Sequence, residues 1–174
     1  MFAIVKLGVI EETARTVQQL FPNTSFPGGP DTEFLRKNEV FDVLNGERKD
    51  DQYYFVTQGD ITVVDGVPIQ QYTSTAKEMS DSTVTDSDGN EVTTYGLKSN
   101  KTDQVKQTAN SSLARTDWMV IRKAERDVAI PDATATYRAA VITECARLEA
   151  AIAGAADVDA LAVVMNAQNW PVEP

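Results

Sequence analysis

Residues 53–72 read YYFVTQGDITVVDGVPIQQY and alternate β-favouring runs with turn signals. Val, Ile, Thr, Tyr and Phe are enriched in strands. Asp65-Gly66 between two such runs indicates a type I′ hairpin turn, which needs positive φ at both central residues. A further turn is expected at Gly59-Asp60. The stretch predicts a small antiparallel meander, with Pro68 placing the last run at an edge because proline has no N–H to donate.

The residues before this meander predict another hairpin and an irregular loop. Residues 2–7 are apolar and β-favouring, Gly8 follows, and residues 9–16 mix polar and apolar positions. Prolines and glycines between residues 22 and 30 indicate a loop, since proline cannot donate to a strand ladder and glycine readily takes positive φ. Residues 34–44 are compatible with either a short helix or a strand.

Residues 80–110 are dominated by Ser, Thr, Asp, Asn and Lys. Two β-favouring runs, residues 82–85 and 91–95, flank residues 86–90, which predicts an exposed hairpin arm too polar to have its own core. Residues 86–91 also carry oxygen ligands and a glycine, but their spacing does not match a calcium-binding EF-hand loop. We therefore interpret them as a plain hairpin turn.

The C-terminal third predicts three helices. The first covers residues 113–127, with a start as early as Thr102 or Asp103, and Ile130-Pro131 ends it because proline cannot continue a helix. The second spans about 132–153, with an apolar stripe at Tyr137, Val141, Leu148 and Ile152. The third opens at a predicted Asp157 N-cap and carries Val158, Leu161, Ala162 and Met165.

These patterns predict an α+β chain with an N-terminal antiparallel β-rich part containing hairpins and a C-terminal small helical bundle. The expected divisions are a β-rich domain over residues 1–78, a polar hairpin arm or linker over 79–110 and a helical module over 111–174. A bundle of about 60 residues buries only a small core. Association with other chains would offset that deficit.

Charge and hydropathy exclude several classes of partner. The chain has 174 residues, 16 of them basic and 26 acidic, and its net charge of −10 repels nucleic acids and anionic membrane surfaces. No apolar run reaches the length of a membrane-spanning helix, and the N-terminus turns acidic where a signal peptide would be apolar. We expect synthesis in a cytoplasm, no membrane insertion and no nucleic-acid binding.

The chain has no histidine, which removes Ser-His-Asp and Cys-His catalysis and His-ligated zinc. Its one cysteine, Cys145, falls at helical spacing among apolar residues, where packing is the better interpretation than nucleophilic chemistry. Phosphate-binding glycine loops and CxxC pairs are absent. Neighbouring carboxylates such as Asp50-Asp51 and Asp157/Asp159 fit solvated surface charge. We predict no enzymatic activity, no cofactor and no metal site.

Large apolar side chains mark a candidate interface in the helical part. Aromatic residues dominate both cores and interfaces. Trp118 and Tyr137 favour the core, whereas Trp170, next to the terminal prolines, fits equally a lid on the bundle or an anchor for a neighbour. Together with Ile121, these three residues form the candidate interface.

The segment from Leu113 to Pro171 resembles a C-terminal module of small tailed-bacteriophage tail proteins, described as tail-fibre, baseplate-associated or tail-fibre-assembly proteins. The N-terminal FAIVKLGVI and VPIQQYTSTAKEM are also similar to segments of such proteins, while the polar insert at residues 80–100 departs from their compact members. The resemblance lies in Leu113-Ala114, Thr116-Asp117-Trp118, Arg122, Ile130-Pro131, Tyr137-Arg138, Val158-Asp159-Ala160-Leu161 and Trp170-Pro171.

The resemblance implies a non-enzymatic structural component of the virion, located in the phage tail at the baseplate or the base of a tail fibre. Its expected partners are other tail or baseplate proteins and further copies of itself, a trimer being one arrangement. The alternative is a tail-fibre assembly chaperone that is absent from the mature virion. A polysaccharide hydrolase with a carboxylate pair is a third hypothesis, but it needs a long repetitive β scaffold that this chain lacks.

Overall fold

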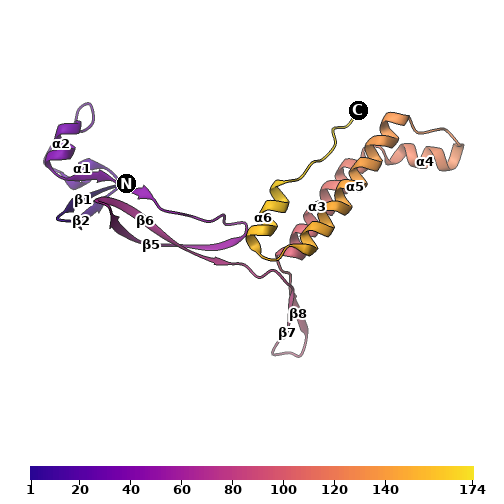
Figure 1. Ribbon diagram of the computed structural model, residues 1–174, viewed down its shortest axis with the longest axis horizontal. Helices are drawn as coiled ribbons and strands as arrows, with labels where there is room; N and C mark the ends of the chain where they lie inside the picture. Colours follow the sequence, from indigo (N-terminus) through magenta and orange to yellow (C-terminus); the bar gives the residue numbers. More distant parts are fainter. The chain divides into compact units, whose positions relative to one another are not determined.

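The computed structural model describes all 174 residues, which form two compact units, residues 1–75 and 76–174 (Figure 1). The N-terminal unit contains antiparallel sheet and the C-terminal unit is mainly helical, so the α+β prediction is confirmed. The division between the units lies close to the end of the predicted β-rich domain at residue 78.

The first sheet of the N-terminal unit has the order β2-β1-β3. Strands β1 (Phe2–Lys6) and β2 (Val9–Ala14) form the predicted antiparallel hairpin, and β3 (Val40–Asp42) pairs with the other edge of β1. Leu7 and Gly8 connect the hairpin with φ values of 52° and 77°. Positive φ at both central residues is the requirement of a type I′ turn.

Two short helices complete this core: α1 (Val17–Leu20) and α2 (Thr32–Lys37). Their N-termini are capped by Thr16 and Asp31, whose side chains accept hydrogen bonds from backbone N–H groups. The buried residues are Ile4, Val17, Leu20 and Val40, with Phe2, Ala14, Phe21, Phe26, Phe34 and Leu35 packed against them. Residues 34–44, whose pattern was compatible with either a helix or a strand, contain the end of α2 and the whole of β3.

The second sheet contains β5 (Tyr54–Val64) and β6 (Val67–Ala76), joined by Asp65-Gly66. The hairpin prediction is confirmed here, with φ values of 50° and 82° at the two turn residues. The predicted turn at Gly59-Asp60 is wrong because β5 runs through both residues. The Gly59 carbonyl accepts a hydrogen bond from Gln70 Nε2 at 2.6 Å, which ties this part of β5 to β6.

The edge position predicted for Pro68 is also wrong. Strand β4 (Leu44–Asn45) pairs in parallel with β6, which gives the order β4-β6-β5 and makes β6 the central strand. The β4 ladder has only two residues and pairs them with Ile69 and Gln70. Pro68 therefore precedes the paired segment, and its missing N–H does not interrupt that ladder.

The C-terminal unit begins with the predicted hairpin, β7 (Ser82–Thr85) paired antiparallel with β8 (Glu91–Thr94). The Asp86 carboxylate organises its turn by accepting hydrogen bonds from the N–H groups of Asp88, at 2.9 Å, and Asn90, at 2.8 Å. These bonds, chiefly the one from Asn90, hold the pKa of Asp86 below its usual value. All residues of both strands are exposed.

Helix α3 (Leu97–Ala114) starts earlier than expected, so the predicted boundary at residue 110 falls inside it. The N–H groups of Leu97 and Lys98 donate to the carbonyl oxygens of Glu78 and Met79, at 2.9 and 3.1 Å. Asp81 accepts hydrogen bonds from the Gly96 N–H and the Ser99 hydroxyl. The chain before the hairpin thus caps the helix after it, and this long-range cap is invisible to a local pattern.

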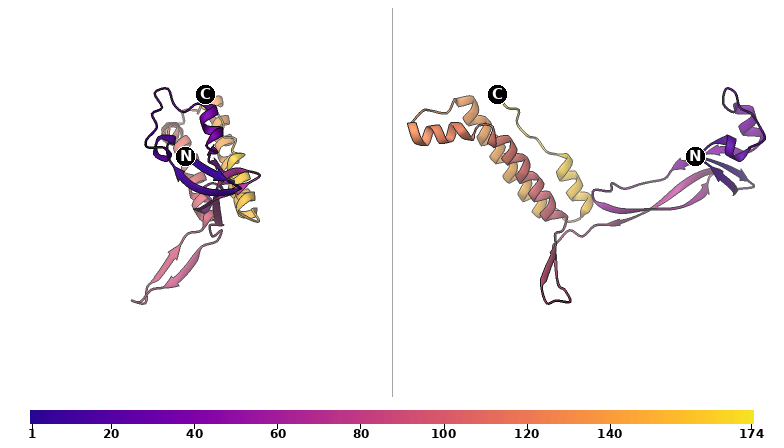
Figure 2. Two further views of the ribbon diagram at one scale, coloured as in Figure 1. Left: turned by 90° about the vertical axis from the view of Figure 1, so that its left-hand side faces the viewer. Right: turned by 180° about the vertical axis from the view of Figure 1, so that it is seen from behind.

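The core of this unit lies between α3 and α5 (Asp132–Gly154), with α6 (Val158–Asn166) packed on α5 (Figure 2). The apolar stripe predicted for the second helix is confirmed, since Tyr137, Val141, Leu148 and Ile152 are buried. The Asp157 N-cap is confirmed by a 2.7 Å hydrogen bond from the Ala160 N–H. Val158, Leu161 and Met165 of α6 are buried as well.

Replacing Gly96 with alanine is expected to destabilise the helical unit by about 2–3 kcal/mol, because overpacking forces the backbone to move. A Cβ at Gly96 would lie 2.5 Å from the carbonyl carbon and oxygen of Ser80. Urea unfolding followed by helical circular dichroism measures the loss.

Gly154→Ala is the matched control for that variant. A Cβ at Gly154 meets no atom within 4 Å, and the residue ends a helix without positive φ. Its stability should match or slightly exceed that of the wild type. Equal stability of both variants would contradict the close approach at Gly96.

Candidate interaction surface

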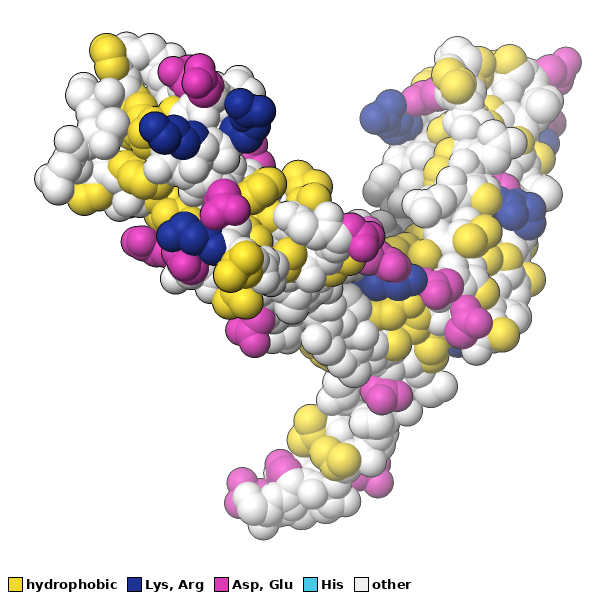
Figure 3. All heavy atoms as spheres, turned by 60° about the vertical axis from the view of Figure 1, so that its left-hand side comes forward, with side chains coloured by type: hydrophobic (Ala, Val, Ile, Leu, Met, Phe, Trp, Pro, Cys, Tyr) yellow, Lys and Arg dark blue, Asp and Glu magenta, His cyan; other side chains and the backbone are white.

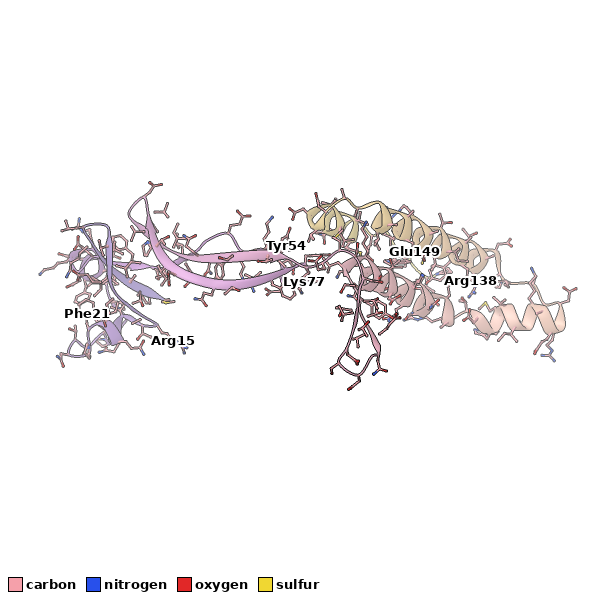
Figure 4. All side chains as sticks on the ribbon, turned by 90° about the horizontal axis from the view of Figure 1, so that it is seen from below. Arg15, Phe21, Tyr54, Lys77, Arg138 and Glu149 are labelled. Atoms are coloured by element: carbon pink, nitrogen blue, oxygen red, sulfur yellow. The ribbon has the colours of Figure 1, made fainter.

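Helix α4 (Asp117–Arg126) diverges from the α3–α5 pair, whereas the sequence predicted one continuous helix over residues 113–127. Arg115 and Thr116 separate the two helices, and Arg138 of α5, labelled in Figure 4, binds at this break. The guanidinium donates to the Leu113 carbonyl at 2.9 Å, the Thr116 hydroxyl at 2.6 Å and the Asp117 carboxylate at 2.9 Å. One side chain therefore connects the end of α3 to the start of α4.

The apolar side of α4 has no partner. Trp118 is 52% exposed and Ile121 is 55% exposed, and no residue of the helix is buried. The core position favoured for Trp118 is therefore wrong. Trp118 and Ile121 stand three residues apart, on the same face of the helix. Val120 adds a further exposed apolar side chain.

α4 carries three cations, of which Arg122 borders this apolar surface, while Lys123 and Arg126 lie on other sides of the helix. None of them forms an ion pair. The guanidinium carbon of Arg122 lies 4.8 Å from the centroid of the Trp118 ring, within the range of a cation–π contact. Its Nε is shielded from solvent and has no hydrogen-bond acceptor. A shielded donor without an acceptor is unfavourable.

The other two candidate interface residues belong to the bundle and not to α4. Tyr137 is only 7% exposed and forms the core with Ala109 and Val141. Its hydroxyl lies 3.5 Å from the carbonyl oxygen of Ser112. Trp170 is partly buried against the same cluster, and its indole N–H donates to Gln168. Trp170 thus lies as a lid on the bundle. The four predicted residues fall into two groups, Trp118 with Ile121 on α4 and Tyr137 with Trp170 in the bundle.

The β7–β8 hairpin presents a second surface without a partner. Val84 and Val92 stand opposite each other and are exposed. Thr83 and Thr93 are also opposite, with their hydroxyl oxygens 2.9 Å apart. The segment 79–97 has no Lys or Arg. Figure 3 shows the hairpin, the narrow projection at the bottom, with hydrophobic and acidic side chains on the visible face.

A shallow apolar groove of about 340 Å³ runs between α3 and α5. Ala109 and Leu113 line it from α3, and Ile142 and Cys145 from α5. Burial, and a 3.2 Å hydrogen bond from the thiol to Glu149, raise the pKa of Cys145. A raised pKa opposes thiolate formation at neutral pH. The geometry fits the packing interpretation of this cysteine.

An ion pair between the buried Glu144 and the half-exposed Arg147, which the sequence reasoning missed, fixes the C-terminal segment. The Arg147 guanidinium donates twice to the Glu144 carboxylate, at 2.7 Å each, and once to the Ala167 carbonyl at 2.9 Å. The Asn169 N–H also donates to Glu144, at 2.7 Å. Glu144 occupies the buried stripe of α5 between Val141 and Leu148, and a charge at such a position is itself the signal of a paired buried group.

The chain has no group of three or more His, Cys, Asp or Glu side chains that could hold a metal ion. No helix is both long enough and apolar enough to cross a membrane. Comparisons with family models, curated proteins and solved structures find no match. The interpretation of the surface therefore depends on its own geometry and charge.

Arg138→Met is expected to release α4 from its fixed position. The variant loses hydrogen bonds from a charged donor, each of which contributes roughly 1.5–3 kcal/mol. Amide hydrogen exchange across residues 116–126 should become about tenfold faster or more, while the amides at the centre of α5 keep their protection.

Arg126→Met is the control, because it removes the same charge from a residue without an ion pair. Hydrogen exchange read by mass spectrometry compares the two proteins. Similar exchange of α4 in both variants would show that Arg138 does not hold this helix.

Glu144→Gln is expected to reduce the pH dependence of the unfolding free energy at acid pH. The hydrogen bonds from Arg147, followed by the Asn169 N–H, hold the pKa of Glu144 below its usual value. A depressed carboxyl pKa contributes stability that is present above the unfolded value of about 4.3 and is lost as pH falls through the folded value. The variant should be less stable than the wild type at neutral pH, by about 1–2 kcal/mol, and should converge with it in acid.

Urea titrations at a series of pH values, followed by helical circular dichroism, measure this difference. Glu125→Gln is the control, since Glu125 is exposed and forms no ion pair. If the difference in unfolding free energy between Glu144→Gln and the wild type were the same at every pH, the carboxylate charge would not be its cause.

Proposed function

We propose that this chain is a structural component of a bacteriophage tail, at the baseplate or the base of a tail fibre. It acts by docking onto other tail proteins and onto further copies of itself. Its apolar and charged side chains bind partner proteins and become buried on assembly. No bond-making step is involved.

The exposed apolar side of α4 is the observation that carries this proposal. A free-standing helix of ten residues is marginal in water, because helical stability in proteins comes mostly from packing of the apolar face. Trp118 and Ile121 leave that packing unmade within the chain. Exposed tryptophan beside arginine is the composition that dominates binding energy in protein interfaces.

The two-unit organisation supports the same function. Each unit has its own small buried cluster, one around Ile4 and Val17 and the other around Tyr137 and Val141. Two small cores allow a single chain to present separate docking faces. The resemblance of residues 113–171 to phage tail modules gives the biological setting.

The alternative function is a tail-fibre assembly chaperone. The same observation favours it, because a chaperone also needs an exposed apolar surface for a client. The two functions differ in whether the chain stays in the particle. A chaperone leaves the fibre after maturation, whereas a structural component remains at a fixed ratio to its neighbours.

Quantitative mass spectrometry of gradient-purified phage particles tests the proposal. Peptides of this chain are scaled against a tail protein of known copy number. We expect a stoichiometric signal whose ratio gives the symmetry of the position. A capsid-only fraction from the same gradient is the control, and it should lack the chain.

Absence from particles, together with abundance in the infected-cell lysate, would contradict the structural role and favour the chaperone. Absence from both particles and tail assembly intermediates would contradict both functions.

A further inference from the structure

We infer that the tip of the β1–β2 hairpin is a docking point of this chain, and that Leu7 inserts from it into an uncharged apolar pocket on a neighbouring tail protein. The inference rests on the proposed function, and it assigns one of the docking contacts to a single side chain. The hairpin belongs to the N-terminal unit, so this contact is separate from the exposed surfaces of the helical unit.

Leu7 is the most exposed large apolar side chain of the protein. It is 102% exposed, so no atom of the chain covers it, and Val9 on the other side of the turn is 64% exposed. A single exposed apolar residue is common at protein surfaces and carries no argument by itself. The backbone of Leu7 provides a second, independent observation.

Leu7 has a left-handed backbone conformation, with φ of 52°. In this conformation the Cβ atom crowds the following carbonyl oxygen, which is costly for most residues other than glycine, asparagine and aspartate. The non-glycine residues of the chain with positive φ are Leu7, Glu39, Asp65 and Asp127. Leu7 is the only apolar residue among them.

The other tight turn of the N-terminal unit shows what the geometry alone selects. Asp65-Gly66 joins β5 and β6 with φ values of 50° and 82°, compared with 52° and 77° at Leu7-Gly8. Aspartate tolerates this conformation and is a preferred first residue of a type I′ turn. Leucine in the same place serves neither the turn geometry nor burial within the chain. Strained residues of this kind cluster at sites where the side chain binds a ligand or partner.

The hairpin holds Leu7 in a fixed place. Strands β1 and β2 stay paired up to Lys6 and Val9, the residues that flank the turn. Strand β1 is the central strand of its sheet, and its residues 3–5 are buried. A side chain presented on a rigid element loses little conformational freedom on binding. Leu7 is therefore preorganised for insertion.

The charge of the tip indicates the chemistry of the pocket. The charged residues of segment 5–11 are Lys6 and Glu11, and the Lys6 Nζ lies 2.6 Å from the Glu11 carboxylate. Their charges cancel, so the tip is a neutral site in a chain of net charge −10. It can be buried without leaving an unpaired charge, and it offers nothing for a charged receptor to pair with.

The shape of the tip favours a protein pocket over a lipid surface. The two apolar side chains of the tip give little membrane insertion, and the acidic chain is repelled by anionic membranes. A convex apolar group needs a concave apolar receptor. A pocket the size of one leucine side chain, lined by uncharged groups, meets that requirement.

Competition during tail assembly tests this contact. Cells that express Leu7→Asn from a plasmid are infected with the phage, which supplies the wild-type chain. Trypsin cleaves after Lys6 and Arg15, so the peptide of residues 7–15 carries the substitution and distinguishes the two chains by mass. Full burial of a leucine side chain contributes a factor of about ten or more to a binding constant. The share of Leu7→Asn in purified particles should be lower than its share in the lysate by that factor.

The same substitution should leave the fold at least as stable, because asparagine accepts positive φ more readily than leucine. Amide hydrogen exchange over residues 2–14 of the purified full chain should be as slow as in the wild type or slower. A variant that folds as well but docks less well separates a binding role of Leu7 from a structural one.

Thr13→Ser is the control for the competition. Thr13 is exposed, lies on the same hairpin away from the tip and falls in the same tryptic peptide. Its share should be equal in particles and lysate.

Equal shares of Leu7→Asn in particles and lysate would overturn the docking point. Exclusion of the variant together with faster exchange of the hairpin amides would also overturn it, because misfolding would then explain the loss. The proposed function is judged separately by the wild-type peptide in the same particles, and absence of that peptide would contradict the function and this contact together.

Two further measurements examine other occupants of the tip. Sedimentation velocity of the purified chain detects a second copy, and flotation with phosphatidylcholine–phosphatidylglycerol vesicles detects a lipid surface. Self-association or vesicle binding that the wild type shows and Leu7→Asn loses would overturn the assignment to a pocket on a different tail protein. We expect neither to depend on Leu7.

Discussion

The position of α4 depends on the Arg138 guanidinium. Its three hydrogen bonds end α3 at the Leu113 carbonyl, hold the Thr116 hydroxyl in the corner and pair with Asp117 at the start of α4. The planar, forked geometry of arginine allows one side chain to bind a carbonyl, a hydroxyl and a carboxylate together. The Thr116 N–H and hydroxyl also donate to the Leu113 carbonyl, at 3.0 Å each, and close the end of α3 locally.

Separation of the two helices has a consequence for burial. A continuous helix over residues 97–126 would extend past the end of the α3–α5 contact with its apolar side in water. The observed break turns α4 away from the pair, and none of its residues is buried. The C-terminal unit therefore buries its α5 stripe completely while leaving Trp118 and Ile121 exposed. Incomplete burial of this kind is typical of a surface that is completed by another chain.

The β7–β8 hairpin and α4 adjoin opposite ends of α3, and both expose apolar side chains that nothing in the chain covers. The hairpin is fixed at its base, where Glu78, Met79 and Asp81 cap the helix, but its strands contact no core. The C-terminal segment shows the opposite arrangement, since Glu144, Arg147 and Asn169 hold it against α5. Stability is thus concentrated in the α3–α5–α6 core, and the elements that project from it are the ones available for recognition.

The sequence by itself determined the features that depend on neighbouring residues. These are the Asp65-Gly66 and Asp86–Asn90 turns, the Asp157 cap and the buried α5 stripe, because turn geometry, capping and helical periodicity are local. Only the tertiary structure decided the continuous path of β5 through Gly59, the central position of β6, the early start of α3 and the break at Thr116. Each of these depends on a partner far along the chain: Gln70, Leu44, Glu78 and Arg138. For the same reason the pattern marked Trp118 as a large apolar residue but placed it in the core, since burial depends on what packs against a face.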